Sequence, residues 1–308
     1  MAESTQPDRQ LPVGNEIFLD HIGHFVRDPQ AASRALVRAG FAPTPVSIQT
    51  QPDPAGGAAR LTGTGNVTAM LTRGYIEVLF KTADTALGQE LDAALARYDG
   101  IHLMAFAVAD AAAAHQRLQQ HGFRVRPLVD MQRPVETGGE PGTAAFTVAR
   151  LEPGEMPEGR IQLLTHRTEP MVWQPRWLAH PNGAAGLKSV TIAVRDVSEA
   201  SQRFERLTGR RARPSSLGQT IALDRGRVEL VTAATFSVMF PQVRIPSLPF
   251  IGAYGISVGS LEIVERTLMQ SGLPSERSGQ SLIAAFPPEL GCGAWNFSCP
   301  NEASADRK

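Results

Sequence analysis

Short apolar runs, each followed by an amphipathic stretch, recur along this chain of 308 residues. The first run extends from Leu19 to Val26 and is followed by Asp28-Pro29, where the aspartate can cap a helix and the proline suits its first turn. Residues 30–39 then carry apolar side chains at helical spacing and stop at Gly40, which suits a left-handed C-terminal cap. The pattern therefore predicts a strand that leads into a helix.

The same order of residues occurs three more times. Asp110, Asp196 and Ser260 are the later capping residues, and each stands twelve or thirteen positions before a glycine. The helix-ending glycines are Gly40, Gly122, Gly209 and Gly272. Because self-similarity of this kind is the mark of duplicated structural units, we infer four copies of one module.

Each copy also ends in a common motif, in which a glycine is followed by any residue, an apolar residue and then a carboxylate or amide. The four motifs are Gly74-Tyr75-Ile76-Glu77, Gly159-Arg160-Ile161-Gln162, Gly226-Arg227-Val228-Glu229 and Gly293-Ala294-Trp295-Asn296. Apolar residues follow, as in a strand, and enough residues precede the motif for two further strands. The predicted fold is therefore α+β, with four βαβββ modules. Since one such sheet would leave a face exposed, the modules should pair into two half-barrel domains, each around a cleft.

The module boundaries divide the chain into two domains. Residues 15–166 hold the first two modules and the expected active site, and residues 187–300 hold the last two, which are degenerate copies with shorter hairpins. Residues 167–186 form a linker that is rich in aromatic and turn residues. Residues 1–14 are expected to be a disordered tail, and residues 301–308 a second tail.

Charge and cysteine content restrict the class of protein. Thirty basic and thirty acidic residues give zero formal net charge, which disfavours a nucleic-acid partner. The most apolar stretch, Leu103 to Ala114, is too short for a bilayer span of about 20 residues, so we expect no membrane protein. Cys292 and Cys299 fit neither a disulfide framework nor a zinc-ligand spacing, and no signal peptide is apparent. We expect a cytoplasmic protein with a small-molecule substrate, and a homodimer is left open.

These motifs resemble the vicinal oxygen chelate superfamily, which includes glyoxalase I and the extradiol ring-cleaving dioxygenases, and most closely its bacterial glyoxalase-like members. The resemblance covers about Ile17 to Pro300 and rests on the run from Leu19 through Asp28 and on Tyr75-Ile76-Glu77. It implies one divalent metal ion in the cleft, of iron, manganese, zinc or nickel. The ligands would come from the first and last strands of paired modules.

The resemblance implies which residues would hold the metal. The first-strand positions are His21, Leu103, Ser189 and Ala253, and the last-strand positions are Glu77, Gln162, Glu229 and Asn296. The implied site therefore lies in the N-terminal half, with His21, Glu77 and Gln162 as ligands. His102 stands one residue out of register and becomes a candidate ligand only if a β-bulge turns it inward.

Alternation along the first strand gives two histidines different environments. His21, Gly23 and Phe25 should face the cleft, whereas His24 should lie beneath the helix as a hydrogen-bonded structural residue. Glu77 is flanked by apolar residues on a buried strand, so its carboxylate needs a cation, a proton or hydrogen bonds to offset desolvation. A metal held with His21 would meet that need.

Two residues are candidates for the proton transfer that glyoxalase-like chemistry requires. Gln162 stands where the superfamily has a catalytic glutamate, and an amide cannot accept a proton. The base is therefore either Glu77 or His166. His166 shares the strand parity of Gln162 and should lie near the rim of the cleft. The alternative for His166 is a solvent-facing residue.

Three further residues are candidate substrate contacts. Phe25 shares the cleft face with His21, and Asn66 could point into the cleft from a hairpin strand. Arg176 stands between two tryptophans and could receive a substrate carboxylate, or it could simply pack against the aromatic rings.

Two classes of function follow. The first is a metal-assisted lyase, isomerase or hydrolase that acts on a small carbonyl or phenolic metabolite whose oxygen the metal polarises. An extradiol-type dioxygenase is an alternative, although those enzymes carry their metal in the C-terminal half with two histidines and one glutamate. The second class is a protein that binds or sequesters a small molecule in the same cleft without turnover. A metal-free acid–base pair of His21 and Glu77 is a third hypothesis.

Overall fold

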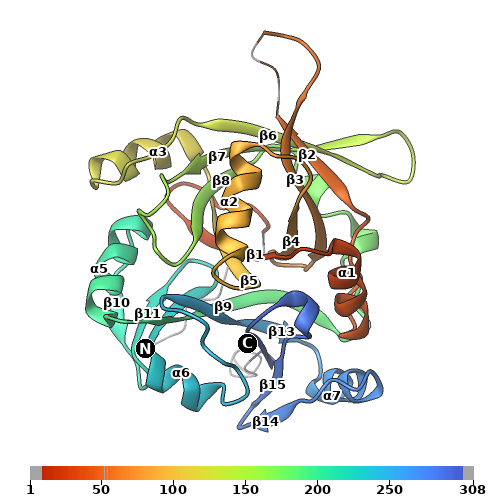
Figure 1. Ribbon diagram of the computed structural model, residues 1–308, viewed down its shortest axis with the longest axis vertical. Helices are drawn as coiled ribbons and strands as arrows, with labels where there is room; N and C mark the ends of the chain where they lie inside the picture. The colour runs from red at the N-terminus through yellow and green to blue at the C-terminus, as the bar shows by residue number, and fades with distance from the viewer. Residues whose placement is uncertain (1–8, 52, 54, 301–308) are drawn as a thin grey trace, which may run out of the picture.

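The structure of the chain is a computed structural model that describes residues 9–51, 53 and 55–300. Of the expected tails at residues 1–14 and 301–308, only residues 9–14 are described, and there the carbonyl of Arg9 accepts a hydrogen bond from Arg225 and Leu11 packs against the cluster that contains Tyr75. Four βαβββ modules follow one another and form two eight-stranded sheets, which confirms the predicted α+β fold and its fourfold repeat. In Figure 1 the sheet of the first two modules occupies the upper half of the molecule and the second sheet lies below it. Among the helices of the described residues, none is both long enough and apolar enough to cross a bilayer.

The first two modules have long strands. Module 1 consists of β1 (Ile17–Phe25), α1 (Pro29–Arg38), β2 (Ser47–Gln51), β3 (Arg60–Met70) and β4 (Tyr75–Lys81). Helix α2 (Ala86–Leu95) leads to module 2, which consists of β5 (Gly100–Val108), α3 (Ala111–Gln120), β6 (Val129–Val135), β7 (Gly142–Arg150) and β8 (Arg160–His166).

These strands form a closed barrel in the order β1-β4-β3-β2-β6-β7-β8-β5. The modules meet twice, because β1 pairs antiparallel with β5 and β2 pairs with β6 at Thr50 and Gln132. Closure leaves no free sheet edge, and alternate side chains of every strand point into the barrel. The first pair of modules is thus more complete than the expected half-barrel.

The last two modules form an open sheet after the connecting segments α4 (Glu169–Val172) and η1 (Pro175–Trp177). Module 3 consists of β9 (Ala184–Val194), α5 (Val197–Thr208), β10 (Ala212–Pro214), β11 (Gln219–Ala222) and β12 (Arg227–Thr232). After α6 (Ala233–Met239), module 4 consists of β13 (Phe250–Val258), α7 (Leu261–Gln270), β14 (Glu276–Ser278), β15 (Ser281–Ala285), η2 (Pro288–Leu290) and β16 (Ala294–Ser298). The outermost strands, β10 and β14, are only three residues long and do not pair with each other, so this sheet does not close.

The predicted helix caps are confirmed. The carboxylate of Asp28 accepts a hydrogen bond from the backbone N–H of Ala31 at the start of α1, and Asp110, Asp196 and Ser260 cap the equivalent helices. These caps satisfy backbone donors that a helix terminus would otherwise leave unpaired.

A buried chain of hydrogen bonds joins the barrel to the open sheet. Trp295 Nε1 donates to the hydroxyl of Tyr254 over 2.7 Å, and that hydroxyl lies 3.0 Å from Nε2 of His24. Because the carbonyl of Leu290 can only accept, Nδ1 of His24 donates to it over 2.9 Å. Burial lowers the pKa of His24 to about 4, so the ring is neutral. His24 therefore has the structural role predicted from its strand position.

Candidate functional site

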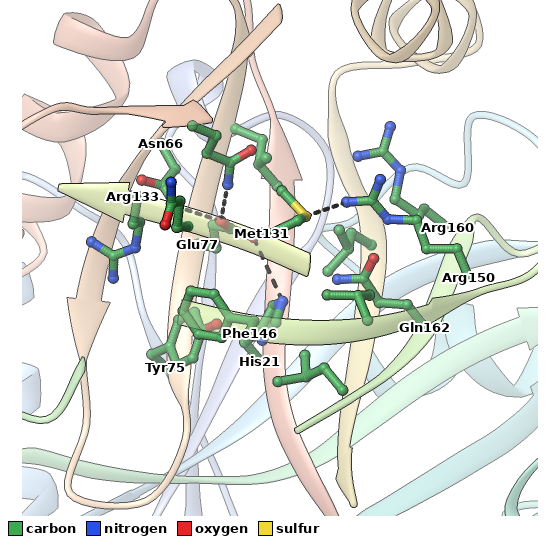
Figure 2. Close-up of a pocket in the computed structure, with 16 residues that line it drawn as sticks. His21, Asn66, Tyr75, Glu77, Met131, Arg133, Phe146, Arg150, Arg160 and Gln162 are labelled. Carbon is green, nitrogen blue, oxygen red and sulfur yellow. Dashed lines mark hydrogen bonds and ion pairs between the residues drawn. The ribbon is translucent and has the colours of Figure 1, made fainter. Parts of the chain in front are cut away.

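The interior of the closed barrel contains a small cavity. Strands of both modules contribute to its lining, and Figure 2 shows His21 and Glu77 near its middle with arginines on either side. The polar lining residues are His21, Gln49, Asn66, Tyr75, Glu77, Gln132, Arg133, Arg150, Arg160 and Gln162. The remaining wall is apolar and includes Leu103, Met131 and Phe146.

A β-bulge in β1 shapes the site. Ile17, Leu19 and Ile22 belong to the same core cluster, although strict alternation would place Ile22 on the opposite face from Leu19. The pairing of β1 with β5 shifts register between Leu19 and His21, so Asp20 is the extra residue of the bulge. The side chain of Asp20 consequently turns toward that of His21.

Asp20 accepts hydrogen bonds from two histidines. Its carboxylate oxygens lie 2.7 Å from Nδ1 of His21 and 2.9 Å from Nε2 of His166, and its side chain is completely buried. Burial alone would raise the pKa of Asp20, but the charge and hydrogen bonds of His166 and His21 outweigh it and hold the pKa well below its usual range. The carboxylate therefore fixes Nδ1 of His21 as a donor and leaves Nε2 for the cavity.

His21 Nε2 faces Glu77 inside the barrel. Nε2 lies 3.6 Å from Oε2 of Glu77, which is too long for a hydrogen bond, and the imidazole stacks on the ring of Tyr75 with 4.4 Å between centroids. The other oxygen of Glu77 accepts hydrogen bonds from Asn66 over 2.6 Å and Gln49 over 3.2 Å. One oxygen of this buried carboxylate is thus held by amides, and the other is directed toward His21 (Figure 2).

Gln162 completes the set of donors in the cavity. Its Oε1 atom is buried and has no hydrogen-bond partner within the part of the chain that the structure describes. Leu103, at the remaining ligand position of the superfamily pattern, also lines the cavity and supplies no donor. Among the described residues, no group of three or more His, Cys, Asp or Glu side chains is arranged to hold a metal ion. The available donors are one imidazole nitrogen, one carboxylate and one amide oxygen.

His166 does not line the cavity. Its side chain is fully buried between the rings of Phe146 and Trp173, with centroid distances of 5.1 and 4.6 Å. Neither the general base nor the solvent-facing residue expected from the sequence matches this environment, because His166 reaches His21 only through Asp20.

His102 and Phe25 lie in a groove at one end of the barrel rather than in the cavity. The expected bulge is present, since the register of β1 and β5 shifts again opposite His102. Nε2 of His102, however, donates to the carbonyl of Tyr98 over 2.7 Å, and burial lowers the pKa of His102 to about 4. His102 is therefore not brought to His21 as a ligand. Phe25 packs beneath the guanidinium of Arg160, 5.2 Å from its ring centroid.

Arg176 also lies outside the cavity, in a groove at the end of the barrel that Arg133 also lines. Its guanidinium stacks on Trp177 at 4.9 Å from the ring centroid and donates to the side chain of Gln174 over 3.1 Å and to the carbonyl of Glu136. The packing alternative describes this arrangement better than direct contact with a substrate beside His21.

Several site residues were not identified from the sequence. Strand alternation alone places Asp20 on the opposite face from His21, and only the bulge reverses that, so the sequence predicts no role for Asp20. Arg133 shares a strand face with Met131 on β6, so alternation along this strand is the sequence feature that indicates its place in the barrel. Burial lowers the pKa of Arg133 and of Arg160, and it lowers that of Arg150 to about 9, with the charge of Arg160 adding to the effect.

Comparisons with known proteins agree with this architecture. A family model described as a glyoxalase-like domain matches residues 19–208. No protein of curated function matches the chain in sequence. A hypothetical protein from Staphylococcus aureus superposes with a TM-score of 0.60 at 11% identity, over 92% of this chain and 100% of that one.

Two similar structures belong to proteins of named activity. A variant of 4-hydroxymandelate synthase from Streptomyces coelicolor has a TM-score of 0.56 at 14% identity, over 94% of this chain and 95% of the other. The Mn(II)-bound glyoxalase from Novosphingobium aromaticivorans has a TM-score of 0.53 at 12% identity, over 93% and 83%. At such identities the likeness concerns the fold alone.

Proposed function

Because the chain belongs to the glyoxalase-like domain family, we propose that its barrel cavity is the active site of an enzyme that uses a divalent metal ion to act on a small oxygenated molecule. The observation that carries the proposal is the arrangement of His21, Asp20 and Glu77. Asp20 orients the imidazole so that Nε2 and the free oxygen of Glu77 are directed at each other across 3.6 Å.

The donor set fits a divalent ion. Two ligands that are each about 2.1 Å from one ion, at a tetrahedral angle, lie about 3.4 Å apart, which is close to the separation between His21 and Glu77. A carboxylate behind the imidazole is the usual support of a metal-bound histidine, and Asp20 supplies it. The unpartnered oxygen of Gln162 offers a third donor. Mixed nitrogen and oxygen ligands suit manganese, iron, zinc or nickel.

The side chains of the cavity would have different roles in the reaction. A bound metal would polarise a carbonyl or phenolic oxygen of the substrate. Glu77 is the only carboxylate among the described residues that line the cavity, so it is the group that accepts or returns a proton, because the amide of Gln162 cannot. Asn66 and Gln49 hold one oxygen of Glu77 and thereby aim the other into the cavity.

Lyase, isomerase or hydrolase chemistry suits this set better than ring cleavage by a dioxygenase. The cavity has one imidazole, His21, and the position that could supply a second donor is Leu103. That leucine also favours the second candidate function, in which the cavity binds a small molecule without turnover. The two free cysteines, Cys292 and Cys299, support our placement of the protein in the cytoplasm.

Metal analysis of the protein, purified without chelator or a nickel column, tests the proposal. We expect about one ion per chain in the wild type and loss of that ion from the His21→Ala variant, because one of three protein ligands is removed. His121→Ala, an exposed histidine at the end of α3, is the control and should retain the ion. Equal metal content in wild type and His21→Ala, with both proteins folded, would contradict the proposal.

A further inference from the structure

Two arginines of the cavity have no acidic partner. Arg133 on β6 is 7% exposed, and within the described residues its guanidinium makes no hydrogen bond or ion pair. Arg150, at the end of β7, directs one Nη atom to the thioether sulfur of Met131 at 2.6 Å, and its buried Nε has no partner. A thioether is a weak acceptor, so neither guanidinium is held directly by a carboxylate, and only the more distant charges of Glu77 and, for Arg150, Glu90 attract them.

Two other arginines of the chain are held by carboxylates, whereas the buried Arg225 has no ion pair among the described residues and stacks on the ring of Phe18 at 4.4 Å. Arg203 on α5 is equally buried, and its guanidinium is held by Glu158 at 2.7 Å and Glu199 at 2.9 Å. Arg160, which also lines the cavity, pairs with Glu90 at 3.4 Å. A buried charge without a direct ion pair is costly, so two of them lining one cavity favour the binding of an anionic ligand there.

The two unpaired arginines stand at opposite ends of the cavity. Arg133 also borders the groove that contains Trp177, whereas Arg150 borders the groove at the other end, which contains Phe25. Figure 2 shows Arg133 on one side of the cavity and Arg150 on the other, with Glu77 and His21 between them. A ligand that reached both arginines would therefore pass the proposed reaction centre.

We propose that the cavity binds a small molecule with an anionic oxyacid group at each end, one held by Arg133 and the other by Arg150. The planar guanidinium binds carboxylate and phosphate oxygens through two parallel hydrogen bonds, and these are the groups that each end would receive. The middle of the ligand lies against Glu77, whose negative charge disfavours a third anion there. This inference deepens the proposed function by naming the substrate class. It rests on that function only for the reaction that the middle of the ligand would undergo beside Glu77.

Calorimetric titration of the full chain tests the inference. The probes are succinate, glutarate and adipate, the monocarboxylates of the same length, and 3-phosphonopropionate. We expect at least one dianion to bind about tenfold more tightly than its monoanionic match, because it gains a second charge-assisted contact. Arg133→Gln and Arg150→Gln should each abolish that advantage, and the lysine variants should restore part of it.

The control variant is Arg124→Gln, an exposed arginine paired with Glu155, which should keep the full advantage. Dianions that bind no better than monoanions, or an advantage that survives in folded Arg133→Gln and Arg150→Gln proteins, would overturn the inference. The metal content of the same samples reports on the proposed function separately. If the wild type binds metal but shows no preference for dianions, the inference fails and the proposed function stands. If the wild type prefers dianions but binds no metal, the proposed function fails and the inference stands.

Discussion

Nδ1 of His21 lies 2.7 Å from a carboxylate oxygen of Asp20, the residue that precedes it in the chain. Neighbouring residues of a regular strand face opposite sides of the sheet, so this contact exists only because β1 is bulged at Asp20. The contact holds the imidazole with Nε2 toward Glu77. The geometry of the candidate site thus depends on an irregularity in the first strand.

Replacing Asp20 by asparagine should weaken metal binding about 10- to 100-fold, which is the usual effect of removing a carboxylate behind a metal-bound histidine. The uncharged amide can no longer stabilise the orientation of both His21 and His166. Competition with a fluorescent chelator measures the affinity. Asp28→Asn is the matched control, because asparagine also caps a helix, and its affinity should equal that of the wild type. Equal metal affinities of the wild type, Asp20→Asn and Asp28→Asn would show that Asp20 does not contribute to metal binding.

The repeat was predictable from the sequence because local physical chemistry marks its boundaries. Aspartate or serine caps and helix-ending glycines recur at nearly constant spacing, and the structure places helix ends at these residues. Closure of the first barrel was not predictable, because it depends on the pairing of β2 with β6, which are distant in sequence.

The candidate site was predictable only where strands are regular. Alternation correctly separated His21 from His24, and the shared last-strand motif located Glu77 and Gln162. Asp20 and His102 lie at bulges, where alternation fails, so the role of Asp20 was missed and His102 was considered as a ligand. Bulges depend on tertiary pairing, which no local pattern in one sequence reports.

Replacing Leu103 by histidine should strengthen metal binding. Leu103 occupies the remaining ligand position, lines the cavity and pairs with Gly23 in the strand next to His21. A second imidazole there would raise the affinity by about tenfold or more, since it adds one nitrogen ligand to a site with three donors. Leu164→His, on the same wall, is a comparison variant in which no gain is expected. A Leu103→His protein that folds but binds no more tightly would show that the two modules do not share a site.

The free energy of unfolding should decrease as the pH is lowered, because His24 is protonated more readily in the unfolded chain. The pKa of His24 is lowered from 6.5 to about 4 by burial, so between these values the unfolded chain binds a proton that the folded chain does not. Between pH 7 and pH 5, this residue alone should reduce the free energy of unfolding by about 2 kcal/mol.

Urea unfolding at several pH values measures this effect. His24→Gln should be less stable than the wild type at pH 7, because it loses buried hydrogen bonds, but it should lose less stability on acidification. His121→Gln should keep the pH dependence of the wild type. An unchanged pH dependence in His24→Gln would mean that other groups account for it.

Replacing Arg133 by methionine should stabilise the ligand-free protein. The variant removes a buried charge that has no ion-pair partner among the described residues and keeps a similar apolar volume, so the protein should gain about 1–3 kcal/mol, the desolvation penalty of a buried unsatisfied group. Thermal and urea unfolding measure the change. Arg203→Met, which breaks the buried contact with Glu158, should instead destabilise the protein. Destabilisation by both replacements would indicate that Arg133 stabilises the folded protein and is not a ligand-binding residue.

The central claim is that His21 and Glu77 hold a divalent ion, and anomalous diffraction from crystals of the manganese-loaded protein tests it most directly. We predict a single anomalous peak inside the barrel, about 2.0–2.3 Å from both His21 Nε2 and an oxygen of Glu77. An anomalous peak at another place in the protein would contradict the account. So would the absence of a peak in a structure in which His21 Nε2 is hydrogen-bonded to Glu77.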